Sequence, residues 1–138
     1  MKRGSILLLI MFVLVLAACE KDENRIVDES NKMLGVWSNQ IVNDSTVVYE
    51  RVETFPENNY GIAFKPQHVF RERKNSEWCG TPPISYADYE GNWTKDGSIV
   101  NVTSGYWGGT VEYLWEIVSV DDEYLTIRLL KEEYHLKE

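Results

Sequence analysis

The chain has 138 residues and a formal net charge of −8, from 14 basic and 22 acidic side chains. An acidic surface repels nucleic acid and anionic lipid headgroups, so we exclude nucleic-acid binding. The five Trp and eight Tyr residues are typical of a β-rich core or of an aromatic-lined cavity.

The start of the chain has the three parts of a secretory signal. Lys2-Arg3 gives a basic start, residues 6–16 form an apolar run, and Ala17-Ala18 precede Cys19. The apolar run would extend about 17 Å as a helix, well short of the ~30 Å of a membrane's hydrocarbon core. We therefore expect residues 1–18 to be a cleaved signal peptide rather than a membrane span.

Leu16-Ala17-Ala18-Cys19 resembles the lipobox of bacterial lipoproteins. The resemblance implies cleavage before Cys19 and acylation of its sulfur and amino group, which would hold the protein stably on a membrane. The alternative is an ordinary signal peptide followed by a chance Cys. The next residues, to Glu23, are similar to the export signal of surface lipoproteins of the Bacteroidetes group. We expect an outer-membrane lipoprotein, either exposed at the cell surface or facing the periplasm.

Residues 19–32 carry the lipidated Cys and an acidic tether, and the folded domain is expected over residues 33–138. Turn chemistry recurs every 8–12 residues between β-branched and aromatic runs, which predicts an all-β sandwich or barrel. The predicted strands cover residues 34–40, 45–55, 60–65, 67–74, 84–94, 98–104, 110–119 and 123–130. Eight short sequential strands favour an eight-stranded antiparallel up-and-down barrel, which leaves no exposed edge.

The clearest strands come last. Apolar residues alternate with others from Val111 to Ile117 and again from Leu125 to Leu129, and a turn at Asp121-Asp122 joins the two runs. This period of two predicts a half-buried antiparallel hairpin. The tail Leu129–Leu136 is a weak candidate for helical periodicity.

Leu34-Gly35-Val36-Trp37 resembles the Gly-x-Trp motif of lipocalins. Tyr89–Trp93 and Tyr124–Leu130 are similar to segments of small lipocalin-like lipoproteins of Bacteroidetes. The resemblance implies that Gly35 and Trp37 lie at the closed end of the barrel, beneath a basic residue from the last strand. Arg128 is the candidate for that residue, although it falls opposite the apolar face of its strand.

An eight-stranded barrel has an interior just wide enough for side chains or for one small ligand. The expected function is non-catalytic binding of a small apolar or amphipathic ligand. The candidate ligand-binding residues are Tyr89, Trp93, Tyr113 and Trp115. The alternative is a filled barrel that acts as an interaction or structural module of the cell envelope. It would bind a protein or glycan through the loop aromatics Trp78, Tyr106 and Trp107.

No pattern predicts catalysis, and we expect no enzyme activity, no cofactor, no metal and a monomer. Cys79 has no histidine nearby in sequence to act as its base, so we expect a buried or partly buried thiol in a rigid loop. Glu112 and Glu116 would lie about 13 Å apart on one strand face, too far for a glycosidase carboxylate pair. Ser45, in Asp44-Ser45-Thr46, is a candidate O-glycosylation site by resemblance to the short site that Bacteroidetes use.

Overall fold

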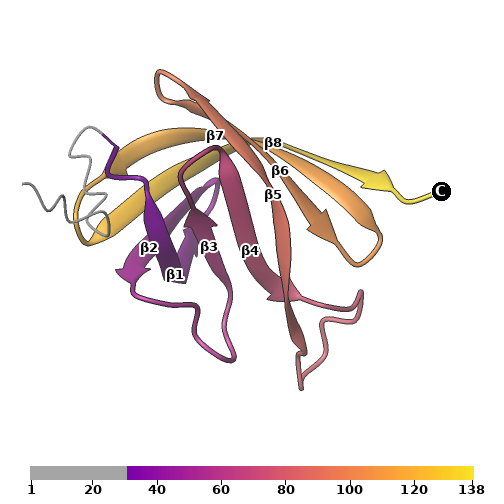
Figure 1. Ribbon diagram of the computed structural model, residues 1–138. Helices are drawn as coiled ribbons and strands as arrows, with labels where there is room; N and C mark the ends of the chain where they lie inside the picture. Colours follow the sequence, from indigo (N-terminus) through magenta and orange to yellow (C-terminus); the bar gives the residue numbers. More distant parts are fainter. Residues whose placement is uncertain (1–30) are drawn as a thin grey trace, which may run out of the picture.

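The computed structural model describes residues 31–138, so the signal segment, Cys19 and most of the tether lie outside the described residues. Eight β-strands form one closed barrel (Figure 1). They are β1 (Gly35–Asn43), β2 (Thr46–Val52), β3 (Gly61–Phe64), β4 (Val69–Asn75), β5 (Tyr86–Asp96), β6 (Ile99–Tyr106), β7 (Gly109–Val120) and β8 (Tyr124–Leu136). Each strand is antiparallel to both neighbours. The predicted all-β, eight-stranded antiparallel barrel is confirmed.

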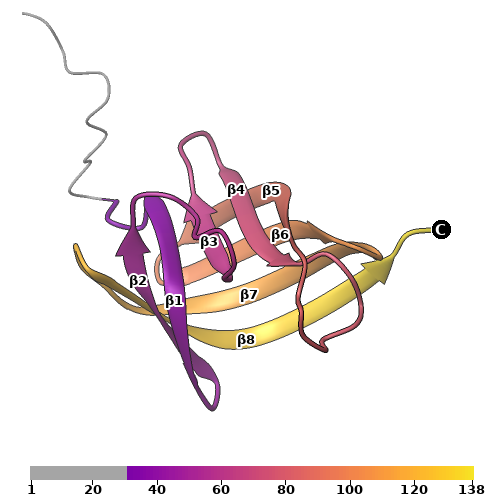
Figure 2. The same cartoon turned by 90° about the horizontal axis from the view of Figure 1, so that it is seen from below.

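The order of strands around the barrel departs from chain order at one place. Strand β1 lies between β2 and β3, and β2 closes the barrel against β8. The connection over residues 53–60 therefore passes across β1 (Figure 2). The guanidinium of Arg73 holds this connection by donating to the carbonyl of Pro56 at 2.8 Å. Strand β3 is short: it pairs with Gly35–Ser38 of β1 on one side and with β4 on the other.

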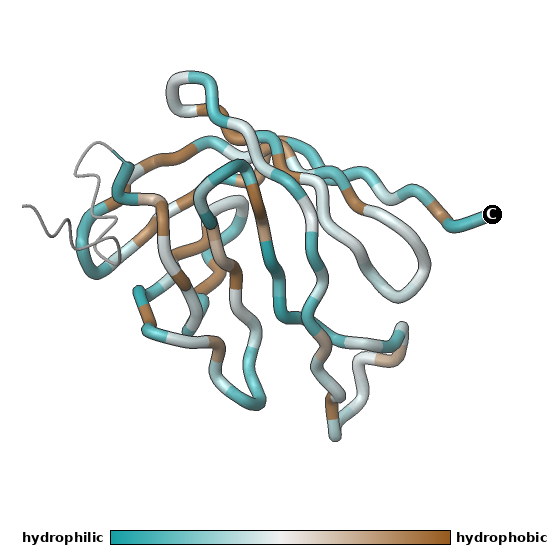
Figure 3. The backbone as a smooth tube through the Cα atoms, in the orientation of Figure 1, coloured by the Kyte–Doolittle hydropathy of each residue, from teal (hydrophilic) through white to brown (hydrophobic). Residues whose placement is uncertain are grey.

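Aromatic side chains fill the middle of the barrel. Phe64 packs edge-on against Phe70 and Trp93, with ring centroids 5.3 and 5.4 Å apart. Trp115 lies 6.0 Å from Phe70. Of the apolar positions predicted to face inward in the last hairpin, Val111, Trp115, Leu125 and Ile127 are buried, whereas Leu129 is 38% exposed. Figure 3 shows hydrophobic residues along the strands that enclose the core.

Strand β8 is longer than the sequence predicted. It runs to Leu136, and a register shift leaves Leu130 without a partner, because Leu114 pairs with Lys131 while Trp115 pairs with Leu129. A bulge of this kind places two residues opposite one and breaks the alternation. The predicted end at residue 130 and the helical interpretation of the tail are both wrong. Among the described residues, no helix has the length and apolarity that a membrane crossing requires.

The barrel has two chemically different ends. The closed end consists of residues 31–34 and the turns β3–β4, β5–β6 and β7–β8. The mouth consists of the β1–β2 turn, the β4–β5 loop (residues 76–85), the β6–β7 turn and the C-terminus. Because β2 and β3 run in the same direction on either side of β1, the described chain begins at the end of the barrel opposite its C-terminus (Figure 1).

Candidate functional site

The closed end is sealed around Trp37. This residue is fully buried, and its indole N–H donates to the carbonyl of Met33 at 2.9 Å. The guanidinium of Arg51 lies 4.1 Å from the centre of the Trp37 ring, a cation–π contact. Arg51 also donates to the carbonyls of Lys32, Leu34, Asp121 and Asp122, at 2.6, 2.8, 3.3 and 2.8 Å. One side chain thus joins the start of the domain to the β7–β8 turn.

The prediction that Arg128 covers Trp37 is wrong. Arg128 forms an ion pair with Glu116 on the outer wall, because its position alternates with the inward Leu125 and Ile127. Arg51 covers Trp37 instead, as its direct cross-strand partner on β2. Gly35 makes room for this contact, since a Cβ at that position would lie 2.5 Å from Nη1 of Arg51.

Of the four predicted ligand-binding aromatics, Trp93 and Trp115 lie deeper in the barrel, and Tyr113 and Tyr89 lie nearer the mouth. Trp93 is buried and donates its indole N–H to the carbonyl of Lys65 at 3.0 Å, in the β3–β4 turn of the closed end. Trp115 is buried in the core. Tyr113 stacks on Trp115 with ring centroids 5.0 Å apart, on the side toward the mouth. Tyr89 is half-buried on β5, closer to the mouth than Trp93.

A polar centre that the sequence analysis missed lies at the base of the mouth. The ammonium of Lys74 lies 2.7 Å from Oε2 of Glu72, and both side chains are only 14% exposed. The hydroxyl of Tyr113 lies 3.3 Å from both carboxylate oxygens of Glu72 and 3.4 Å from Nζ of Lys74. The same ammonium lies 5.4 and 5.7 Å from the ring centres of Tyr89 and Tyr113.

Carboxylates set the electrostatics of this centre. Burial raises the pKa of Tyr113, and the negative charge of Glu72 raises it further. Burial also raises the pKa of Tyr134, which donates a hydrogen bond to Glu132. Glu132 is the cross-strand partner of Tyr113, so the two side chains share one face of the sheet. Both phenols therefore stay protonated and serve as hydrogen-bond donors.

Above this centre the mouth forms a hollow of about 200 Å³. It is lined by Tyr60, Lys74, Asn75, Glu77, Tyr106, Trp107 and Tyr134. Tyr106 is half-buried and meets Tyr134 edge-on at 5.1 Å and Trp107 at 5.6 Å. Trp107 is 54% exposed. Two of the predicted loop aromatics, Tyr106 and Trp107, thus belong to one concave site.

The third loop aromatic, Trp78, is 79% exposed on the β4–β5 loop. The adjacent Cys79 is exposed as well, which corrects the expectation of a buried or partly buried thiol. Hydrogen bonding to the backbone of Thr81 lowers the pKa of Cys79. The preceding arginines, Arg71 and Arg73, are paired with Glu90 and Asp88. Among the described residues, no base contacts the thiol, whereas a nucleophilic thiol needs a positioned base.

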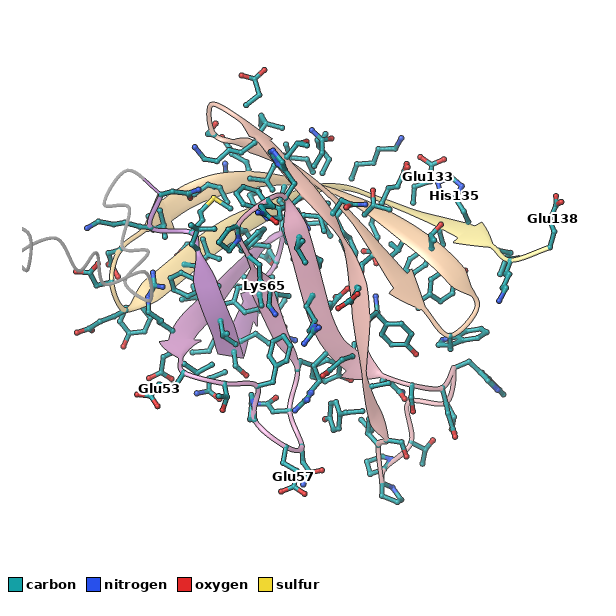
Figure 4. All side chains as sticks on the ribbon, in the orientation of Figure 1. Glu53, Glu57, Lys65, Glu133, His135 and Glu138 are labelled. Carbon is teal, nitrogen blue, oxygen red and sulfur yellow. The ribbon has the colours of Figure 1, made fainter. Side chains whose placement is uncertain are left out.

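The outer face of β7 and β8 carries a separate group of charged side chains. Ligand atoms of Glu112, Glu133 and His135 lie within 4.8 Å of one another, all of them exposed. Figure 4 shows Glu133 and His135 pointing away from the barrel. Glu133 is paired with Lys131 at 2.7 Å, and Glu112 lies 3.4 Å from His135. Contacts between neighbouring surface side chains account for this group.

No family model, no curated protein and no solved structure matches this chain.

Proposed function

We propose that the chain is a lipid-anchored, lipocalin-like lipoprotein of the outer membrane that binds a small amphipathic ligand at the barrel mouth. One observation carries the proposal: an aromatic-lined hollow opens at the mouth, while Trp37 and Arg51 close the barrel interior at the opposite end. Ligand sites of this kind are concave and mostly apolar, with a few polar groups that fix orientation. The role is binding, without a chemical step.

The place where the described chain begins supports an anchored barrel with its mouth directed outward. Lys32 and Leu34 are held at the closed end by Arg51, and the lipobox Cys19 precedes them in the sequence. A lipid attached at Cys19 would tether the closed end, and the mouth would open away from the membrane. At the cell surface, the mouth would then meet ligands in the medium.

The hollow favours a ligand group that is smaller than a drug-sized molecule. Pockets for such molecules measure roughly 300–1,000 Å³, whereas this hollow measures about 200 Å³. Below it, Trp93, Trp115 and Phe70 are buried and occupy the barrel interior. We therefore place the ligand's headgroup or ring in the hollow, with the rest of the molecule extending past Trp107.

Native mass spectrometry of the full chain, purified gently from the cells that make it, tests this proposal. We expect a small-molecule adduct that organic extraction removes and that Trp107→Ala weakens. The matched variant Trp78→Ala, which alters a Trp outside the hollow, should keep the adduct. An adduct that both variants retain unchanged would contradict a mouth site. A bare protein whose Trp fluorescence also ignores added amphiphiles would contradict ligand binding itself.

The exposure of Trp78 favours a second candidate function. Its indole is 79% exposed on a loop at the same end as Trp107, and exposed loop aromatics offer large rigid faces for recognition. The barrel would then be an interaction module for an envelope protein or glycan. A partner captured by the wild type and lost in Trp78→Ala, with no small-molecule adduct, would favour this function.

A further inference from the structure

We propose that the mouth hollow selects an organic cation, an ammonium or quaternary ammonium group carrying a short apolar chain. This inference rests on the proposed binding function and adds the charge of the ligand's headgroup. It is carried by the aromatic walls of the hollow together with the carboxylates at its base and rim.

The walls have the composition that recognises organic cations. Tyr60, Tyr106, Trp107 and Tyr134 line the hollow. Aromatic rings attract a cation within about 6 Å of the ring centre, and aromatic cages for quaternary ammonium groups use this attraction. The protein already contains such a contact, because the Lys74 ammonium lies 5.4 Å from the ring centre of Tyr89 and 5.7 Å from that of Tyr113. A ligand cation in the hollow would make the same kind of contact with the aromatic rings nearer the mouth.

The charges around the hollow favour a cation over an anion. Lys74 is neutralised by Glu72 at 2.7 Å, so the pair leaves no free ammonium for a ligand carboxylate. Glu77 lines the hollow, and Glu132 lies on the inward face beside Tyr113 and Tyr134. Among the described residues that line the hollow, Lys74 is the one basic side chain. Because it is already paired with Glu72, an anionic headgroup would be repelled by these carboxylates, whereas an ammonium would be attracted by them. Burial is the main reason that the pKa values of Tyr113 and Tyr134 are raised, and the negative charges of Glu72 and Glu132 raise them further, in the direction expected beside carboxylates.

The size of the hollow limits the cation to a headgroup. Its volume of about 200 Å³ corresponds to roughly seven water molecules at ~30 Å³ each. A trimethylammonium group with the first carbons of its chain fits this space, and a longer chain would pass Trp107 into solvent.

Three probes with the same six-carbon chain test the inference: hexyltrimethylammonium, hexanoate and hexanol. Each is titrated into the full-length protein in a non-ionic sugar detergent, with Trp fluorescence as the readout and partition into empty micelles subtracted. We expect hexyltrimethylammonium to bind at least tenfold more tightly than hexanoate, equivalent to ~1.4 kcal/mol. Added salt should narrow this difference, because screening weakens charge attraction.

Neighbouring residues of β8 supply the matched variants. Glu132→Gln removes the inward carboxylate, and Glu133→Gln removes a carboxylate that pairs with Lys131 on the outer face. We expect the first variant to weaken binding of the cation about fivefold and the second to leave it within twofold of wild type. Glu77→Gln removes a second carboxylate that lines the hollow. It repeats the test on the β4–β5 loop, outside the strands.

The outcomes separate the inference from the proposed function. Hexanoate or hexanol binding as tightly as the cation, with the signal lost in Trp107→Ala, would overturn cation selection and keep a mouth site. Equal cation binding in Glu132→Gln and Glu133→Gln would also overturn it. If none of the three probes binds, both the inference and the proposed amphiphile site fail.

Discussion

The two ends of the barrel use the same kinds of side chain in opposite ways. At the closed end, the Trp37 ring is buried and an arginine with four carbonyl partners covers it. At the mouth, Trp107 is 54% exposed, and the aromatic rings around it line an open hollow. An aromatic ring whose polar neighbours are all satisfied stabilises the fold, whereas one left open to solvent is available to a ligand.

The two ends differ in how their charged side chains are paired. Arg51 directs its donors to backbone carbonyls of residues that are distant in sequence, so its charge is used within the fold. Glu72 and Lys74 neutralise each other at the base of the mouth. In the part of the chain that the structure describes, the Glu132 carboxylate accepts a side-chain hydrogen bond only from the hydroxyl of Tyr134. We therefore expect the closed end to contribute most to stability, and we propose the mouth as the binding end.

The largest expected effect concerns the closed end. Arg51→Ala removes the charged hydrogen bonds to four carbonyls and the contact with Trp37, and we expect it to lower the free energy of unfolding by about 3 kcal/mol. Arg128→Ala, which removes one outer-wall ion pair, should cost about 0.5 kcal/mol. Urea unfolding followed by Trp fluorescence measures both. Equal costs would contradict the assignment of Arg51 as the closure residue.

The ion pair beneath the mouth should be costly to break from one side. Glu72→Gln or Lys74→Met alone leaves a poorly solvated charge, and we expect each to lower the free energy of unfolding by about 2 kcal/mol. The double variant should cost clearly less than the sum of the two. A double-mutant cycle in urea measures this coupling, and strict additivity would show that the two side chains do not interact.

The outer wall of the mouth should contribute stability that depends on pH. The hydrogen bond from Arg73 lowers the pKa of Asp88, so the folded state favours the ionised carboxyl. The contribution is fully present above the unfolded value of about 3.9 and is lost as pH falls through the lower folded pKa. Asp88→Asn should therefore cost about 0.5–1 kcal/mol at pH 7 and nothing near pH 2. Glu57→Gln, in the exposed connection before β3 (Figure 4), controls for the loss of one negative charge, and a constant difference across pH would contradict the linkage.

The smallest effect on stability is expected at the β4–β5 loop. Cys79 is exposed and its pKa is lowered by hydrogen bonding to Thr81, so more of the thiol is ionised at neutral pH in the folded state. Iodoacetamide should alkylate Cys79 faster in the folded protein than in urea, with Cys79→Ser as the blank, because the thiolate is the reactive form. Cys79→Ser should change the free energy of unfolding by less than ~0.5 kcal/mol. Slower alkylation of the folded protein would mean that the thiol is protected.

Local chemistry made most of the fold predictable. The Asp121 carboxylate accepts from the backbone of Glu123 and Tyr124 at 2.8 and 2.7 Å, which makes the β7–β8 turn, and Gly97 adopts φ +60° in the β5–β6 turn. Asp and Gly are residue types that favour turns, so the sequence alone indicates both turns. The position of β1 between β2 and β3 was not predictable, because it depends on which strands meet after the chain has closed. The bulge at Leu130 disguised the end of β8, because two adjacent leucines break the alternation of a strand and are compatible with a helix.

The candidate site was predictable only in part. Aromatic residues in a Gly-rich turn pointed to Tyr106 and Trp107, and Trp37 was expected in the closed end. The Glu72–Lys74 pair was missed because charged residues at alternate positions of a strand usually face solvent. A signal was nevertheless present: Phe70, Glu72 and Lys74 share one strand face, so a buried Phe70 implies inward charges. Arg51 could not be chosen over Arg128 until the pairing of β1 with β2 was known.

The five tryptophans provide the most direct measurement of where a ligand binds. Each indole N–H gives its own signal in a ¹H–¹⁵N NMR spectrum, recorded here on the full-length protein as hexyltrimethylammonium is added. We expect a large shift for Trp107, while the signals of Trp37 and Trp93, whose N–H groups are bonded to the carbonyls of Met33 and Lys65, stay unchanged. Large shifts of Trp93 and Trp37 with Trp107 unmoved would place the ligand inside the barrel and contradict a mouth site.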